Sequence, residues 1–586
     1  PRWSRVEETF GEDPVLSGVL GASMVDGLGG GNLSQKYATI ATLKHFLAYA
    51  VPEGGQNGNY ASVGIRDLHQ NFLPPFRKAI DAGALSVMTS YNSIDGIPCT
   101  SNHYLLTQLL RNEWKFRGFV VSDLYSIEGI HESHFVAPTK ENAAIQSVTA
   151  GVDVDLGGDA YTNLCHAVQS GQMDKTVIDT AVCRVLRMKF EMGLFEHPYV
   201  DPKIAAKTVC RKEHIELARK IAQSSITLLK NENSILPLSK TINKVAVIGP
   251  NADNRYNMLG DYTAPQEDSN VKTVLDGILT KLSPFRVEYV RGCAIRDTTV
   301  NEIEQAIEAA RRSEVVIVVV GGSSARDFKT SYKETGAAVA EEGSVSDMEC
   351  GEGFDRASLS LLGRQQELLE SLQKTGKPLI VVYIEGRPLE KNWASEYADA
   401  LLTAYYPGQE GGNAIADVLF GDYNPSGRLP ISVPRSVGQI PVYYNKKAPR
   451  NHDYVEVPSS PLYSFGYGMS YTTFEYSDLQ VVQKSARCFE VSFKVKNTGK
   501  YDGEEVSQLY MRDEYASVVQ PMKQLKHFER FHLKKGEEKK VTFVLTEEDF
   551  FLVNYTLKKV VESGTFQVMI GSSSDDIRLE KSISVE

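Results

Sequence analysis

Short apolar runs of strand length alternate with amphipathic segments of helix length over the first third of the chain, and this alternation limits the possible folds most. Polar residues follow each run, as they do where the carboxyl ends of parallel strands form a site. About four or five such strands can be counted, where eight would close a barrel. We therefore expect a (β/α) barrel that is N-terminally incomplete here, its missing strands supplied by an upstream segment or another chain. The expected strands are 38–46, 84–91, 119–122 and 152–156.

The alternation stops near residue 198 and restarts with an apolar run at 244–250. Later β-rich runs, separated by helical patterns, predict a second α/β domain with helices on both faces of a parallel sheet. Apolar and polar residues then alternate strictly at 489–496, which favours a C-terminal β-sandwich of the fibronectin-III-like kind. The expected parts are 1–198 (barrel domain), 199–243 (linker), 244–430 (α/β sandwich domain), 431–480 (connecting segment) and 481–586 (β-sandwich).

Composition and charge exclude several classes of function. The 586 residues carry a formal net charge of -11 and no cluster of Lys and Arg, so we expect no nucleic-acid partner. No apolar run approaches the ~20 residues that span a bilayer, so no membrane partner is expected either. Seven scattered cysteines without a CxxC pair, and the lack of a Walker or GxGxxG motif, indicate no disulfide framework, metal site or cofactor.

Asp123 is the first candidate for catalysis. It follows the apolar run 119–122 and so lies at the predicted carboxyl end of a strand. Barrel folds carry their chemistry at that end of their strands. From position alone, an Asp that caps the following helix is an equally good interpretation.

Six segments in consistent order resemble the signatures of glycoside hydrolase family 3, in its three-domain β-glucosidase and β-xylosidase type. The resemblance covers essentially the whole chain, and six matches in order are far more specific than any one hexamer. The segments are RWSR with FGEDP (2–14), LKHF (43–46), VMTSYN (87–92), the strand that ends at Asp123, GEGFDR (351–356) and LYSFGYGMSY (462–471).

The resemblance implies a sugar-binding role for four side chains. Lys44 and His45 would hydrogen-bond hydroxyl groups of the sugar, with Arg5 and Tyr91 beside them. A lysine offers donors and no acceptor, which suits recognition of a fixed hydroxyl pattern. The alternatives are that Arg5 pairs with Glu8 and that Tyr91 belongs to the core.

Glu352 would be the general acid/base. It lies between two glycines in the long polar stretch 321–356, and it alone matches the family's position for this residue. Glu349 is the runner-up, while Asp355 and Arg356 are expected to form an ion pair that shapes the loop. The other acids of the stretch, Glu341, Glu342 and Asp347, are interpreted as solvated loop charges.

These assignments predict double displacement with retention of configuration. Asp123 attacks the anomeric carbon while Glu352 protonates the leaving oxygen, and Glu352 then activates water. The expected enzyme is a retaining exo-β-glycosidase that releases terminal β-D-glucose from β-glucosides or cello-oligosaccharides. The expected partner is a small oligosaccharide or glycoside substrate. A homodimer is a possibility that the sequence leaves undecided.

Leu124 leaves the sugar preference open, because many β-glucosidases of the family have Trp after the nucleophile and many xylosidases have Cys. A β-xylosidase or a bifunctional xylosidase/arabinosidase is therefore an alternative. An alternative of another class is a non-catalytic or incomplete carbohydrate-binding relative. The resemblance favours a periplasmic or secreted protein.

Overall fold

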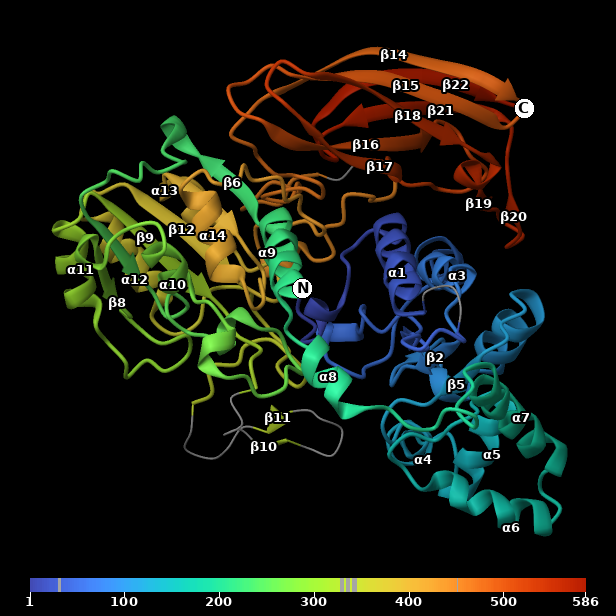
Figure 1. Cartoon of the computed structure of the whole chain (residues 1–586). Helices are drawn as coiled ribbons and strands as arrows, with labels where there is room; N and C mark the ends of the chain where they lie inside the picture. Colours follow the sequence, from blue (N-terminus) through green and yellow to red (C-terminus); the bar gives the residue numbers. More distant parts are fainter. Residues whose placement is uncertain (30–32, 327–330, 333–337, 340–344, 450–451) are drawn as a thin grey trace. The chain divides into compact units, whose positions relative to one another are not determined.

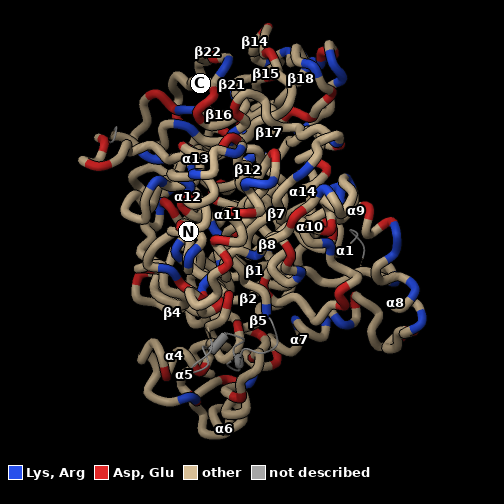
Figure 2. Tube along the Cα trace, turned by 90° about the vertical axis from the view of Figure 1, so that its left-hand side faces the viewer, with Lys and Arg blue, Asp and Glu red and all other residues tan. Residues whose placement is uncertain are grey.

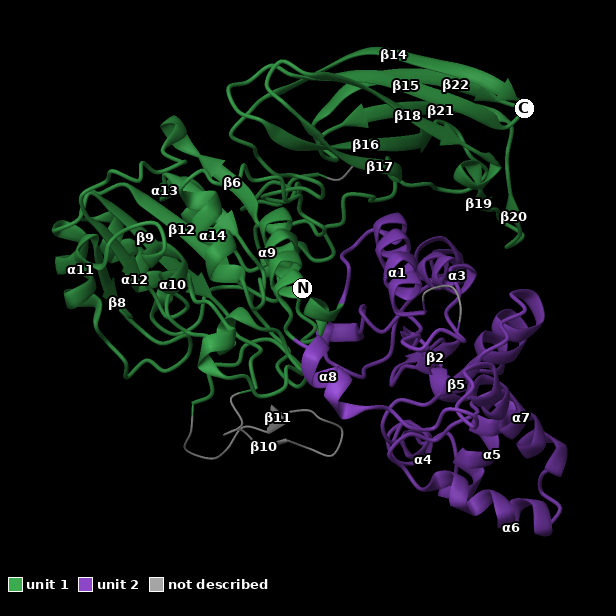
Figure 3. Cartoon of the chain, in the orientation of Figure 1, with its two compact units in different colours: residues 1–8, 210–333, 337–586 green, residues 9–209, 334–336 purple. Residues whose placement is uncertain are grey.

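The computed structural model describes residues 1–29, 33–326, 331–332, 338–339, 345–449 and 452–586. It divides into two compact units, shown in Figure 3. We call residues 9–209 the small unit, and residues 1–8 together with nearly all of the chain from residue 210 onward the large unit. Lys and Arg residues are interspersed with Asp and Glu residues along the trace (Figure 2). No described helix is long and apolar enough to cross a membrane.

The small unit is built on a short parallel sheet. β2 (Ser86–Thr89) lies between β1 (Thr42–Phe46) and β5 (Phe119–Val121), and Val121 forms a parallel bridge with Val154. The four predicted runs are thus in this sheet or bonded to it, but the described residues do not close a barrel. The other elements are α1 (Pro14–Gly29), η2 (Glu53–Gly55), α2 (Ile65–Asp67), η3 (Leu68–Phe72), α3 (Leu73–Asp81), β3 (Ser93–Ile94), β4 (Ile97–Pro98), η4 (Cys99–Ser101), η5 (Tyr104–Glu113), α4 (Glu128–Glu132), α5 (Lys140–Ala150), η6 (Ala160–Asn163), α6 (Leu164–Gln169), α7 (Lys175–Glu191) and α8 (Pro202–Thr208).

Gly118, just before β5, lets this strand approach its neighbour. A Cβ at this position would lie 2.0 Å from the carbonyl oxygen of Leu85, so a larger residue would push the two segments apart. Val87 of β2 and Val120 of β5 are fully buried in the same core. The local sequence therefore fixes β5, and with it the position of the residue that follows.

A six-stranded sheet, in the order β6-β13-β12-β9-β7-β8, organises the first part of the large unit. Its neighbouring strands are parallel except for β6, which runs antiparallel to β13 at one edge. Ile317 and Val319 belong to one core cluster, whereas Val316 and Val318 belong to another, so both faces of β9 are buried. The strands are β6 (Thr227–Asn231), β7 (Val245–Ile248), β8 (Val287–Val290), β9 (Val315–Gly321), β12 (Leu379–Ile384) and β13 (Ala400–Thr403).

The helices of this part divide between the two clusters (Figure 1). Residues of α9, α10 and α14 pack in the first cluster, and residues of α11, α12 and α13 pack in the second. This arrangement confirms the α/β sandwich, although β6 comes from a segment expected to be a linker. The helices are α9 (Lys212–Ser225), α10 (Val274–Leu279), α11 (Ile303–Arg311), α12 (Gln365–Gln373), α13 (Asn392–Tyr397) and α14 (Gly411–Leu419), and the short strands β10 (Ser331–Tyr332) and β11 (Ala338–Val339) pair with each other.

The C-terminal part is a β-sandwich, as predicted. One sheet has the order β14-β15-β18 and the other has the order β17-β16-β21-β22. Phe489, Val491, Phe493 and Val495 alternate inward into the core between them. The strands are β14 (Phe474–Ser485), β15 (Cys488–Asn497), β16 (Gly503–Asp513), β17 (Gln524–Leu533), β18 (Glu538–Leu545), β19 (Leu552–Val553), β20 (Lys559–Val560), β21 (Gly564–Gly571) and β22 (Ile577–Val585).

Candidate active site

Asp123 follows β5 in the small unit and is buried. Its Oδ1 accepts the N–H of Leu124 at 2.8 Å, and its Oδ2 lies 3.4 Å from Nε2 of His45. Helix α4 begins five residues later, with Ile127 at the N-cap and no side-chain cap. The side chain of Asp123 therefore does not cap this helix, which was the alternative interpretation of its position.

Lys44 and His45 lie in the second half of β1, the strand on the other side of β2 from β5. His45 is buried, and its ring makes an edge contact with the ring of Tyr49 at 4.8 Å between centroids. Tyr49 in turn lies 6.0 Å from Tyr91, which follows β2. Lys44 is exposed. The parallel strands thus bring the small-unit candidates to neighbouring strands of one sheet, namely Lys44, His45, Tyr91 and Asp123.

Glu352 is buried in the large unit, with polar partners on both carboxylate oxygens. Nη1 of Arg5 lies 3.2 Å from Oε1, and the hydroxyl of Tyr262 donates to Oε2. The flanking Gly351 and Gly353 have φ angles of 89° and 95°, in the left-handed region that glycine adopts without strain. The two glycines therefore serve the turn that presents Glu352.

Arg5 shows the alternative contact that the sequence allowed. Its Nε lies 2.5 Å from Oε1 of Glu8, and its Nη2 lies 2.9 Å from Oε2. A bidentate pair of this kind holds a guanidinium group in one orientation. Arg5 contacts Glu352 from this fixed position, and we call Arg5, Tyr262 and Glu352 the Glu352 group.

Glu349, the runner-up for the acid, is tied to two arginines. Its Oε2 lies 2.6 Å from Nη1 of Arg356 and 3.4 Å from Nε of Arg387, and it is buried. The carboxylate of Glu349 is therefore the shared partner of two arginines. The ion pair expected to shape the loop thus joins Arg356 to Glu349, while Oδ1 of Asp355 accepts the N–H of Ser4 at 2.8 Å.

The remaining acids of the loop differ in how they are placed. Asp347 lies 3.8 Å from Arg291 and accepts the N–H of Arg296 at 3.4 Å. Glu341 and Glu342 lie outside the described residues.

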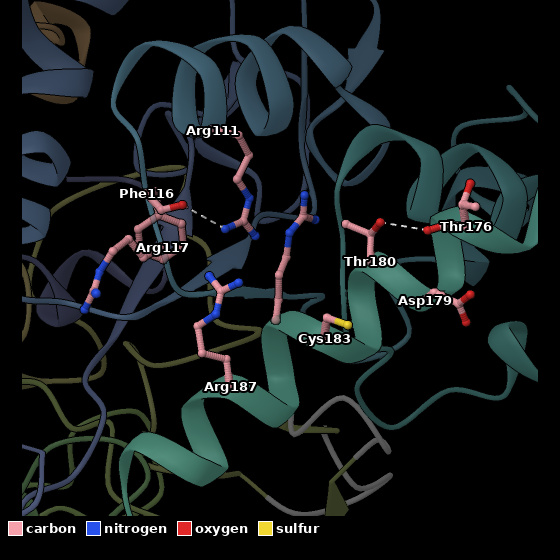
Figure 4. Close-up of a pocket in the computed structure, with 9 residues that line it drawn as sticks. Arg111, Phe116, Arg117, Thr176, Asp179, Thr180, Cys183 and Arg187 are labelled. Atoms are coloured by element: carbon pink, nitrogen blue, oxygen red, sulfur yellow. Dashed lines mark hydrogen bonds between the residues drawn. The ribbon is translucent and has the colours of Figure 1, made fainter.

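Asp153, within the fourth predicted strand (152–156), forms a buried ion-pair network. Its Oδ2 lies 2.8 Å from Nη2 of Arg111 and also accepts the N–H of Val120, and its Oδ1 lies 2.8 Å from Nη1 of Arg184. Both arginines line a cavity of about 440 Å³, in which Figure 4 shows Arg111 and Arg187 reaching into the same space. None of the predicted site residues lines this cavity, whose lining is Arg111, Phe116, Arg117, Thr176, Asp179, Thr180, Cys183, Arg184 and Arg187.

Glu7, which the sequence analysis did not single out, is a half-buried acid two residues after Arg5. The Oγ of Ser324 donates to its Oε2 at 2.7 Å, and a Cβ on Gly386 would lie 2.7 Å from the same oxygen. Burial raises the pKa of Glu7 from 4.5 to about 8, the Ser324 hydrogen bond opposes this shift, and the nearby Asp261 adds to it. Glu7 is therefore protonated in the folded protein at neutral pH.

We expect Glu7→Gln to stabilise the protein above about pH 5. A carboxyl group whose pKa is higher in the folded state binds its proton more tightly there, so unfolding becomes easier as the pH rises from about 4.5 to about 8. A neutral amide removes this dependence, which amounts to at most ~1.4 kcal/mol per pH unit. Chemical denaturation at pH 5 and at pH 8 measures it. Equal stability of the variant and the wild type at both pH values would contradict a protonated Glu7.

In the described part of the chain, no group of three or more His, Cys, Asp or Glu side chains is arranged to hold a metal ion.

Tyr262 contacts Glu352, but the sequence analysis did not predict it as a site residue. The sequence signal for it was weak: an acidic residue followed by an aromatic one, Asp261-Tyr262, in the loop region after β7.

Comparisons with known proteins agree with this organisation. Residues 1–188 match the glycosyl hydrolase family 3 N-terminal domain, residues 226–471 match the family 3 C-terminal domain, and residues 505–574 match the fibronectin type III-like domain. A β-xylosidase of Formosa agariphila is 39% identical over 98% of this chain and 80% of its own. A periplasmic β-glucosidase of Salmonella typhimurium is 37% identical over 99% of this chain and 78% of its own.

The fold is similar to solved structures as well. A β-glucosidase from Listeria innocua, solved in complex with isofagomine, matches with a TM-score of 0.91 and 35% identity, over 100% of this chain and 80% of that one. Family models, relatives and structures all lead to the same assignment. The chain belongs to glycosyl hydrolase family 3 and is a glycoside hydrolase.

Proposed function

We propose that this protein is a retaining exo-β-glycosidase that releases terminal β-D-glucose from β-glucosides or cello-oligosaccharides. The observation that carries the proposal is the buried carboxylate of Asp123, at the end of β5 and 3.4 Å from His45, in a chain of this family. A carboxylate at a strand end beside polar side chains is suited to attack on a bound sugar.

In the proposed mechanism, Asp123 forms the glycosyl-enzyme intermediate while Glu352 donates a proton to the departing oxygen. Glu352 then takes a proton from water, which attacks the intermediate and restores the original configuration. Lys44, His45, Tyr91 and Arg5 bind sugar hydroxyl groups. Fixed donors at these positions reject sugars whose hydroxyl pattern leaves the donors unpaired.

A β-xylosidase, or a bifunctional xylosidase/arabinosidase, is the second candidate. One observation favours it: the Formosa β-xylosidase and the Salmonella β-glucosidase are nearly equally similar to this chain, at 39% and 37% identity. Initial rates on nitrophenyl β-glucoside, β-xyloside and α-arabinoside distinguish the candidates. The highest kcat/KM on the xyloside would replace glucose with xylose in the proposal.

A non-catalytic carbohydrate-binding protein is the alternative of another class. The presence of both Asp123 and Glu352 favours an enzyme, since binding alone needs neither a nucleophile nor a proton donor. Sugar binding without hydrolysis of any substrate in the panel would favour the binding protein.

The first-formed sugar should have the β configuration. Two successive inversions at one carbon restore the starting anomer, so a β-glycoside gives a β-sugar before mutarotation. Proton NMR during the first minutes of hydrolysis follows the two anomeric signals, with a chemically mutarotated sample as reference. An α-anomer formed first would refute double displacement.

A further inference from the structure

Tyr262 has a strained backbone at a place where its side chain contacts Glu352. Its φ angle is 59°, in the left-handed region that glycine adopts readily and bulky residues rarely adopt. Its N–H donates to Oδ1 of the preceding Asp261 at 2.7 Å. A strained conformation of this kind persists only where surrounding contacts hold it, and such residues concentrate at functional sites.

Asp261 joins Tyr262 to the loop that carries Glu352. Oδ2 of Asp261 accepts the backbone N–H of Glu352 at 3.0 Å, and its Oδ1 lies 2.6 Å from Nε of Arg326. The guanidinium carbon of Arg326 lies 4.3 Å from the centre of the Tyr262 ring, a cation–π contact. One buried carboxylate thus fixes the backbone of Tyr262, the backbone of Glu352 and the cation that covers the ring.

The hydroxyl of Tyr262 acts on the carboxyl group of Glu352 directly. It donates to Oε2, while Nη1 of Arg5 contacts Oε1. Burial raises the pKa of Tyr262, Arg5 opposes this shift, and the hydrogen bond to Glu352 adds to it. The phenol therefore keeps its proton and acts as a hydrogen-bond donor at neutral pH.

We propose that Tyr262 is a positioning residue for the acid/base Glu352, an inference that rests on the proposed function. A carboxyl group can rotate about its terminal bond, and proton transfer needs the group within about 0.5 Å and 10–20° of the productive geometry. The Tyr262 hydroxyl restricts this rotation, and Asp261 holds the backbone of Tyr262 and the backbone of Glu352 in fixed positions relative to each other.

Replacement of Tyr262 with phenylalanine tests the inference. The variant keeps the ring and its contact with Arg326 but loses the hydroxyl. We expect kcat/KM to fall about 10-fold or more on a substrate with a poor leaving group such as cellobiose, because general acid catalysis typically contributes 10²–10⁴-fold. On a dinitrophenyl β-glucoside, which leaves without protonation, kcat/KM should stay within about 2-fold of the wild type, because kcat/KM reports the step in which the leaving group departs.

Tyr397→Phe is the matched control. Tyr397 on α13 and Tyr262 are both 46% exposed, and the ring of Tyr397 lies 5.2 Å from that of Trp393. The control should leave both rates unchanged, and thermal unfolding should show that both variants are folded. If Tyr262→Phe changes the rates on both substrates by the same factor, or changes neither, the inference is overturned while the proposed function stands. Wild-type protein inactive on both substrates would overturn the proposed function and the inference with it.

Discussion

We expect Asp123→Ala to lower kcat by about 10⁴-fold or more while the protein stays folded. In the proposed mechanism the carboxylate forms the bond to the anomeric carbon, so its removal takes away a step of the reaction rather than a contact with the substrate. The backbone N–H of Leu124 and the ring of His45 are among its contacts, and neither is a paired cation in the core. Steady-state rates on an aryl β-glycoside, together with the melting temperature, measure both effects.

Asp153→Asn is the control. Asp153 is a buried carboxylate of the same unit, but it forms ion pairs with arginines and is not proposed to react with the sugar. The substitution weakens the ion pairs with Arg111 and Arg184, and breaking a buried pair typically costs 3–5 kcal/mol of stability. We expect Asp153→Asn to lower the melting temperature and Asp123→Ala to lower the rate. A variant of Asp123 with near wild-type turnover would refute its role as nucleophile.

We expect Glu352→Ala to lower kcat/KM by about 10²–10⁴-fold for substrates with poor leaving groups and by far less for activated aryl glycosides. Without the acid, only a leaving group that is stable as an anion departs readily. The base is missing as well, so a small anionic nucleophile such as azide should restore turnover on the activated substrate and give a β-glycosyl azide. Rates with and without azide, and identification of the product by mass spectrometry, test this.

Glu349→Ala gives the contrasting result. Removing this carboxylate leaves Arg356 and Arg387 without their shared partner, so we expect lower stability and no azide rescue. If azide rescues Glu349→Ala and not Glu352→Ala, the runner-up is the acid/base residue.

The strands of the large unit show which parts of the fold the sequence predicts. The runs that became β9 and β12 are continuous and apolar because both faces of those strands are buried. β8 is only partly buried, and its sequence, Val-Glu-Tyr-Val, gives no comparable signal. β6 pairs along an edge after a helix, so its five residues could be assigned only once the neighbouring β13 was known.

The candidate site shows a similar division. Asp123 could be found from its place after a strand, and Glu352 from its two glycines and the family resemblance. Tyr262 could not, because its contact joins residues 90 positions apart and leaves no periodic pattern. Arg5 was predicted to bind sugar or to pair with Glu8, and only coordinates could reveal that it also contacts Glu352.

The contacts of residues 1–8 bear on how this protein folds. Arg5 meets Glu352 across 347 positions of sequence, and the carbonyl oxygen of Ser4 accepts the N–H of Gly351. The entropy cost of closing a loop grows with the logarithm of its length, and closing one of this size costs about 3 kcal/mol more than closing one of ten residues. Contacts of high sequence separation also form slowly. A nascent chain can therefore complete the strands around Asp123 well before the surroundings of Glu352, whose formation must wait until residues beyond 350 have left the ribosome.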